Sequence, residues 1–182
     1  MKQIDAWISA CRLRTLPLSI SGAIIGSGIA YSRGFFDSSV FALTILTTLS
    51  LQILSNLAND YGDGVKGTDN EYRIGPERAL QSGIISPKQM KNAIVLNVII
   101  CLILVVSLIY VAFGAAQFLT SLVFVILGIL AIVAAIKYTV GDSAYGYKAL
   151  GDIMVFLFFG WLSVLGTYFL YAKQLDFLMV LP

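Results

Sequence analysis

The chain has 182 residues, of which 58% are hydrophobic and only 12% are charged, and its mean hydropathy is +0.87. This composition excludes an ordinary soluble domain and predicts an integral membrane protein. The net charge of +2 does not call for a nucleic-acid partner. Because the sequence contains no histidine, a His₃ zinc site and a Ser-His-Asp triad are both excluded within these residues.

Long uncharged runs predict the membrane spans. The chain contains four of them: 15–32, 38–59, 92–136 and 153–172. The third run holds 45 residues, which as one helix would be roughly 68 Å long, whereas the hydrocarbon core of a bilayer is about 30 Å thick. It must therefore turn back, and Gly114 and Gln117 are the helix breakers near its middle. The expected fold is an all-α bundle of transmembrane helices with five spans.

The two ends of the chain differ from these spans. Residues 1–14 precede the first span, and their mixture of apolar and polar positions predicts a short amphipathic segment on the membrane surface. No cleaved signal peptide is expected, because no small-residue cleavage site follows a short apolar core. A new apolar run begins after Asp176 and stops at Pro182. We therefore expect residues 1–182 to be the N-terminal portion of one longer transmembrane domain.

The basic residues predict the orientation in the membrane. If the N-terminus is cytoplasmic, ten of the twelve Lys and Arg residues lie on the cytoplasmic side, and only Arg33 and Lys173 lie outside. The positive-inside rule then places the N-terminus and the two polar loops, 60–91 and 138–152, in the cytoplasm. Since both loops lie on one side, they are expected to form one site.

The strongest functional signal is Asn56-Leu-Ala-Asn-Asp-Tyr-Gly-Asp63, which ends the second apolar run. On a helix Asn56, Asp60 and Asp63 stand at i, i+4 and i+7 and share one face. Asp69 follows, in a loop that Gly62, Gly64 and Gly67 are predicted to make flexible. Amide and carboxylate oxygens suit Mg²⁺, which usually takes one or two carboxylates and lets water and phosphate complete its shell. We therefore predict a magnesium site made of Asn56, Asp60, Asp63 and Asp69.

Basic residues of the two loops are candidates for binding the phosphate oxygens of a metal-bound diphosphate. They are Lys66, Arg73, Arg78 and Lys148. A purely topological role is an open alternative for the first three, because cytoplasmic loops need basic residues anyway. Three glycines in the first span, Gly22, Gly26 and Gly28, are predicted to allow close helix packing.

The acidic stretch, with Val65-Lys-Gly-Thr-Asp69, Arg73-Ile-Gly-Pro76 and Arg78-Ala-Leu-Gln-Ser-Gly83 after it, resembles the first aspartate-rich motif of the UbiA superfamily of intramembrane prenyltransferases. More narrowly, the chain resembles the 1,4-dihydroxy-2-naphthoate polyprenyltransferases of menaquinone synthesis. The segments Arg12-Leu-Arg-Thr-Leu-Pro17 and Tyr145-Gly-Tyr-Lys-Ala-Leu-Gly-Asp152 are similar to that branch too.

The resemblance implies nine helices around a cavity that opens to lipid, in a bacterial inner-membrane enzyme. It implies transfer of a polyprenyl chain from its diphosphate to a hydroxylated aromatic acid. Asp60 and Asp63 would contribute to catalysis by holding Mg²⁺. Arg14 is a candidate for pairing with the carboxylate of the acceptor. The family's second acidic loop is expected beyond residue 182.

Three other functions are alternatives to this interpretation. A phosphatidyl-alcohol phosphotransferase is disfavoured because Gly67 and Thr68 stand where its motif has Ala-Arg. A cation carrier is disfavoured because every charged residue lies at a predicted span end or in a loop, whereas carriers tend to place ionisable groups near mid-membrane. A prenyltransferase with another acceptor, such as 4-hydroxybenzoate, is left open by the sequence.

Overall fold

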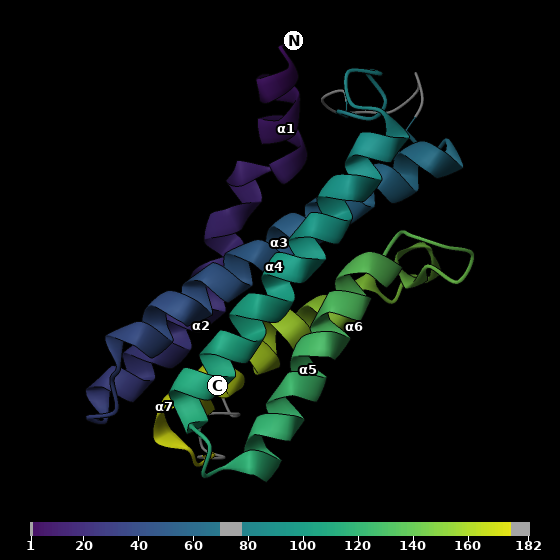
Figure 1. Ribbon diagram of the computed structural model, residues 1–182. Helices are drawn as coiled ribbons and strands as arrows, with labels where there is room; N and C mark the ends of the chain where they lie inside the picture. The colour runs from purple at the N-terminus through teal and green to yellow at the C-terminus, as the bar shows by residue number, and fades with distance from the viewer. Residues whose placement is uncertain (1, 70–77, 176–182) are drawn as a thin grey trace.

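The computed structural model describes residues 2–69 and 78–175, and all regular secondary structure in this part of the chain is helical. Figure 1 shows the long helices lying side by side as a bundle. The elements in chain order are α1 (Gln3–Cys11), η1 (Leu13–Thr15), α2 (Leu16–Ser32), α3 (Ser38–Lys66), α4 (Pro87–Phe113), α5 (Phe118–Lys137), η2 (Tyr145–Lys148), α6 (Gly151–Val155), η3 (Phe156–Gly166) and α7 (Thr167–Ala172). The predicted all-α class is confirmed.

Five segments of these helices are long and apolar enough to cross a membrane, as the sequence predicts. They are Gln3–Ser32, Ser38–Lys66, Pro87–Phe113, Phe118–Lys137 and Gly151–Ala172. The protein is an integral membrane protein with several spans. Among its long helices α3 is central, because it contacts α1, α2, α4, α5 and α7.

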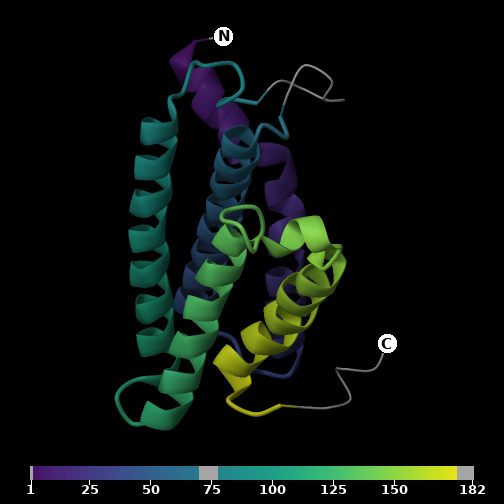
Figure 2. The ribbon, with the colours of Figure 1, turned by 90° about the vertical axis from the view of Figure 1, so that its right-hand side faces the viewer.

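The 45-residue apolar run turns back where the sequence predicts. α4 ends at Phe113, α5 begins at Phe118, and Gly114 between them has a φ of 61°. Residues with a Cβ atom rarely adopt this conformation, whereas glycine does so readily. Figure 2 shows the turn at the end of the bundle opposite the N-terminus.

Side-chain caps determine where α3 begins. The Asp37 carboxylate accepts hydrogen bonds from the backbone amides of Ser39 (2.7 Å) and Val40 (3.0 Å). These amides are among the four at a helix start that have no partner within the helix. At the other end Gly67, with a φ of 71°, closes the helix after Lys66. The predicted metal ligands Asn56, Asp60 and Asp63 lie within the last three turns of this helix.

The N-terminal helix α1 is separated from α2 by a bend at Arg12, whose φ is 49°. Ala6 and Ala10 of α1 are buried, and α1 contacts α3. Ile4 and Ile8 are exposed on its other side. This division between a packed face and an open apolar face is compatible with a segment on the membrane surface, which stays a prediction.

Half of the apolar side chains of α5 are exposed on the surface of the bundle. Only Ile132 of α5 is buried, whereas Leu119, Val123 and Ile126 are exposed. Lipid tails are as apolar as leucine, so a helix with such a surface is stable in a bilayer without a protein partner on that side. The outward faces of the bundle therefore suit contact with lipid.

The last span contains a long π-helical segment, η3, between the α-helical turns of α6 and α7. π-Helical geometry usually occurs as a single turn inside an α-helix and is frequent at functional sites. Here it extends over 11 residues. Its side chains form one wall of the cavity described below.

Two glycines of α2 allow close packing against η3. A Cβ atom at Gly22 would lie 2.8 Å from the carbonyl oxygen of Phe159, and one at Gly26 would lie 2.5 Å from that of Val164. The packing role predicted for these two residues is confirmed. The same prediction for Gly28 is wrong, because a Cβ atom there would meet no described atom within 4 Å.

We expect Gly26→Ala to lower the thermal unfolding midpoint of the protein in detergent. The added methyl group must push α2 away from η3, and overpacking of this kind costs about 1–3 kcal/mol. Gly28→Ala is the matched control on the same helix, and its midpoint should be unchanged or slightly higher, since alanine favours helix. Equal midpoints for the two variants would contradict the packing role of Gly26.

Candidate functional site

The candidate site lies at the end of α3, which stays helical through Lys66. The predicted helical spacing of Asn56, Asp60 and Asp63 is therefore confirmed. One local expectation is wrong: Gly62 and Gly64 lie within the helix and do not form a flexible loop.

These two glycines let neighbouring segments approach α3 closely. A Cβ atom at Gly62 would lie 2.8 Å from the Cβ atom of Thr139, just after α5, and one at Gly64 would overlap Cδ2 of Leu80. The Thr139 hydroxyl also donates a hydrogen bond to the carbonyl oxygen of Ala58 at 3.1 Å. The end of α3 is thus enclosed between the segment after α5 and the segment before α4.

Asp60 is enclosed by this packing and is only 1% exposed. Among residues 2–69 and 78–175, neither of its carboxylate oxygens has a hydrogen-bond partner of normal geometry. The backbone of Leu80 and the guanidinium groups of Arg78 and Arg12 are its nearby polar groups. Burying a carboxylate without hydrogen bonds is costly. Its two oxygens are therefore well suited to bind a cation.

Asp63 connects the two polar loops. The hydroxyl group of Tyr147, in η2, donates a hydrogen bond to Oδ1 of Asp63. Burial and the Asp63 carboxylate together raise the pKa of Tyr147 to about 12, so its hydroxyl keeps its proton at neutral pH. The ammonium group of Lys66 lies 4.2 Å from the centre of the Tyr147 ring, a cation–π contact.

Asp69 lies next to Arg78 on the other side of the site. Its Oδ2 atom is 3.8 Å from Nε of Arg78, and its side chain is 4% exposed. Arg78 also interacts electrostatically with Asp60. The guanidinium group of Arg78 therefore interacts with two carboxylates that are nine residues apart in the sequence.

Asn56 links α3 to the segment between α1 and α2. Its Nδ2 donates to the carbonyl oxygen of Cys11 (2.9 Å) and to Oγ1 of Thr15 (3.2 Å), and its Oδ1 accepts from Nε2 of Gln52 (3.2 Å). The side chain is 2% exposed. In this structure Asn56 therefore holds helices together, and its role as a metal ligand stays a prediction.

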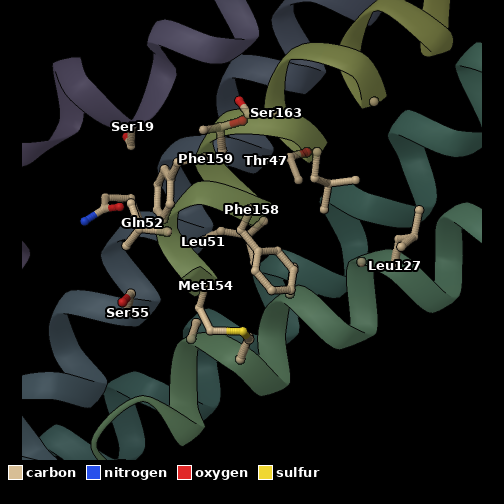
Figure 3. Close-up of a pocket in the computed structure, with 18 of the residues that line it drawn as sticks. Ser19, Thr47, Leu51, Gln52, Ser55, Leu127, Met154, Phe158, Phe159 and Ser163 are labelled. Carbon is tan, nitrogen blue, oxygen red and sulfur yellow. The ribbon is translucent and has the colours of Figure 1, made fainter. Parts of the chain in front are cut away.

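A cavity of about 580 Å³ lies beside this part of α3, between α2, α4, α5 and η3. Figure 3 shows Leu51, Gln52 and Ser55 of α3 on one side of it, and Phe158 and Phe159 of η3 opposite. Most of its wall is apolar. Its polar side chains toward the site are Arg12, Thr15, Gln52, Asn56 and Asn59.

The cavity and the carboxylates occupy adjoining positions on one helix. Asn56 and Asn59 line the cavity, whereas Asp60, Asp63 and Asp69 are not among its lining residues. A molecule with a long apolar part and an anionic end would fit this arrangement. The apolar part would lie in the cavity, and the anion would lie against the metal ligands and the basic side chains.

The predicted site residues are brought together to different extents. Asp60, Asp69 and Arg78 form one group, and Asp63 and Lys66 meet at Tyr147. Lys148 is exposed in η2, one residue after Tyr147. Arg14 is also exposed and does not line the cavity. Arg73 lies outside the described residues.

The donors present are suitable for magnesium. Within residues 2–69 and 78–175, no three acidic, thiol or imidazole groups are close enough to hold a metal by themselves. Mg²⁺ needs fewer, because water and substrate phosphate usually complete its shell. Within the described residues, neither oxygen of Asp60 has a hydrogen bond of normal geometry, and Asp63 has a second oxygen beyond the one that Tyr147 contacts. These two residues could therefore hold the ion.

Sequence reasoning missed four residues of the site and cavity: Arg12, Gln52, Asn59 and Tyr147. Gln52 and Asn59 carried a local signal, since they stand at i−4 and i+3 from Asn56 and extend the polar face of the helix. Arg12 and Tyr147 lie in the two segments that resemble the narrower branch of the family, but no local pattern shows their contacts with α3, because these depend on how distant segments pack.

Comparison with known proteins gives a consistent result. The family model described as the UbiA prenyltransferase family matches residues 19–182. The chain is 46% identical over its whole length to the 1,4-dihydroxy-2-naphthoate octaprenyltransferase of Escherichia coli (strain K12), of which it covers 58%. It is 45% identical to the Haemophilus influenzae protein of the same name, again over the whole chain and over 59% of that relative.

A more distant relative has the same name. The 1,4-dihydroxy-2-naphthoate octaprenyltransferase of Mycobacterium leprae is 35% identical over 97% of this chain and 57% of its own length. The chain thus spans less than three fifths of each of these relatives. No solved structure matches it significantly.

We expect Asn56→Ala to lower the thermal unfolding midpoint, because the buried partners of the amide lose their hydrogen bonds, at a cost of about 1–3 kcal/mol. Ser55→Ala, at the preceding position in the cavity wall, is the control and should change the midpoint little. If thermal unfolding shows no difference between the two variants, the anchoring role of Asn56 is wrong.

Proposed function

This chain belongs to the UbiA prenyltransferase family, and we propose that the protein transfers a polyprenyl chain from its diphosphate to 1,4-dihydroxy-2-naphthoate. The reaction releases diphosphate and carbon dioxide and gives the hydroquinone form of demethylmenaquinone, a step of menaquinone synthesis. The names of the similar proteins support this choice of acceptor. The structural observation that supports it most is the apolar cavity beside the carboxylates of α3.

The acidic residues bind the metal in this proposal. Asp60 and Asp63 would hold Mg²⁺, with Asn56 and Asp69 as further candidates. When bound, Mg²⁺ neutralises the negative charge that develops on the departing diphosphate. The burial of Asp60 without hydrogen-bond partners supports its role, since a protein keeps such a carboxylate at a cost in stability.

Basic side chains would bind the phosphate oxygens. Arg78 is the best placed of them, because it already contacts the carboxylates of the site, and a guanidinium group can bind two phosphate oxygens at once. Lys66, Arg73 and Lys148 complete the proposed set. We propose that Arg12, and not Arg14, binds the carboxylate of the acceptor, because Arg12 lines the cavity.

The apolar wall of the cavity would hold the prenyl chain and exclude water. Loss of diphosphate develops an allylic cation, which water would capture if it could enter. The electron-rich hydroxylated ring attacks that cation instead. Phe158 and Phe159 of η3 stand opposite α3 in this wall (Figure 3), where aromatic faces can stabilise a positive charge.

The proposed location is the bacterial cytoplasmic membrane, with the N-terminus and the acidic site on the cytoplasmic side. The structure supports a common side for the two polar loops, since Tyr147 of the second contacts Asp63 at the start of the first. The excess of basic residues assigned to that side supports the cytoplasm.

The acceptor can be tested with the full-length protein in membranes. Octaprenyl diphosphate and Mg²⁺ are supplied with either 1,4-dihydroxy-2-naphthoate or 4-hydroxybenzoate, and prenylated products are separated by chromatography. We expect product from the naphthoate and little or none from the benzoate. Product from the benzoate alone would replace the proposed acceptor, and product from neither would reject the proposed reaction.

Asp60→Asn and Asp63→Asn should each reduce turnover by about a hundredfold or more, the range seen when one key electrostatic group is lost. Asp69→Asn should reduce turnover by a smaller factor. Because Asp60 and Asp63 serve one ion, the double variant should be little worse than either single one. Turnover is measured against Mg²⁺ concentration.

The exposed Asp142 of the second loop provides the control, since Asp142→Asn makes the same chemical change away from the carboxylates. This variant should match the wild type. Wild-type Mg²⁺ dependence in the variant that lacks both Asp60 and Asp63 would eliminate the proposed metal site.

A further inference from the structure

The loop between α5 and α6 is fixed to the end of α5 by two consecutive residues. The Tyr145 hydroxyl donates a hydrogen bond to the carbonyl oxygen of Ala134 at 2.8 Å. The Gly146 amide donates to the carbonyl oxygen of Tyr138 at 2.9 Å, and a Cβ atom at Gly146 would lie 2.6 Å from that oxygen. The backbone before Tyr147 is therefore held close to α5.

Tyr147 extends from this fixed loop to α3. Its hydroxyl contacts Oδ1 of Asp63, and its ring faces the ammonium group of Lys66 at 4.2 Å. The two α3 residues are three positions apart, a spacing at which an acid and a base on one helix can form an ion pair. One tyrosine thus contacts both members of a pair that would otherwise neutralise each other.

We propose that Tyr147 is a positioning residue that keeps the Asp63 carboxylate ready for Mg²⁺. Its hydroxyl fixes Oδ1 and leaves Oδ2 for the metal, and its ring keeps the Lys66 ammonium from pairing with that carboxylate. The inference rests on the proposed function, because it takes Asp63 as a ligand of the ion. Tyr147 comes from a distant loop and does not itself touch the metal, so it is a further member of the proposed site.

Outer residues that orient metal ligands have measurable effects, and their loss typically weakens metal affinity or activity by 10- to 100-fold. Two substitutions separate the two contacts of Tyr147. Tyr147→Phe removes the hydroxyl and keeps the ring, whereas Tyr147→Leu removes both. Tyr145→Phe is the matched control, because the Gly146 amide still holds the loop when the Tyr145 hydroxyl is lost, and that hydroxyl does not reach the carboxylates.

The test is direct binding of Mn²⁺, a spectroscopic substitute for Mg²⁺, to the folded full-length protein without substrate. The free ion is measured by electron paramagnetic resonance. We expect Tyr147→Phe to weaken binding about tenfold and Tyr147→Leu more, up to about a hundredfold. Adding Lys66→Met to Tyr147→Leu should restore part of the affinity, and Tyr145→Phe should bind within about twofold of the wild type.

The possible results lead to different conclusions. Wild-type affinity in Tyr147→Phe, or an equal loss in Tyr145→Phe, would overturn the positioning role while leaving the proposed function intact. If Lys66→Met restores nothing in the Tyr147→Leu background, the part assigned to the ring is wrong. Mn²⁺ binding by the wild type that is unaffected by Asp63→Asn would remove Asp63 from the metal site, and the inference with it.

Discussion

The structure depends on keeping charged and amide groups buried at the end of one helix of an apolar bundle. α3 spans the membrane region with few polar contacts and then, within two turns, carries Asn56, Asp60 and Asp63. A buried polar group is costly unless a partner satisfies it. Neighbouring segments supply partners to Asn56 and Asp63, whereas in the described part of the chain the oxygens of Asp60 have no hydrogen bond of normal geometry.

Satisfying these groups also shapes the space beside them. Asn56 holds the bend after α1 against α3, and Thr139 holds the end of α5 to the same helix. The cavity extends away from these contacts, with the π-helical segment η3 as its opposite wall. The hydrogen bonds of Asn56 and Thr139 thus lie at one end of a cavity whose wall is mostly apolar. This arrangement suits a substrate with a charged head and a long hydrocarbon chain.

The sequence alone determined the membrane class, the five spans and the turn at Gly114, because these depend on local composition and on the length of uncharged runs. It also determined that Asn56, Asp60 and Asp63 share a helix face, because helical periodicity is a local property. The acidic stretch led to the family for a similar reason, since its residues are contiguous in the sequence.

Only the tertiary structure shows which residues outside α3 lie at the candidate site. Tyr147 lies 84 positions from Asp63, and the Asn56 amide meets a carbonyl group 45 positions away; no local pattern encodes such distances. The choice of Arg12 over Arg14 for the cavity wall follows from the bend between α1 and α2. Gly28 shows the same limit, because small-residue spacing indicates that two helices can approach, but only the packed structure shows whether a neighbour is there.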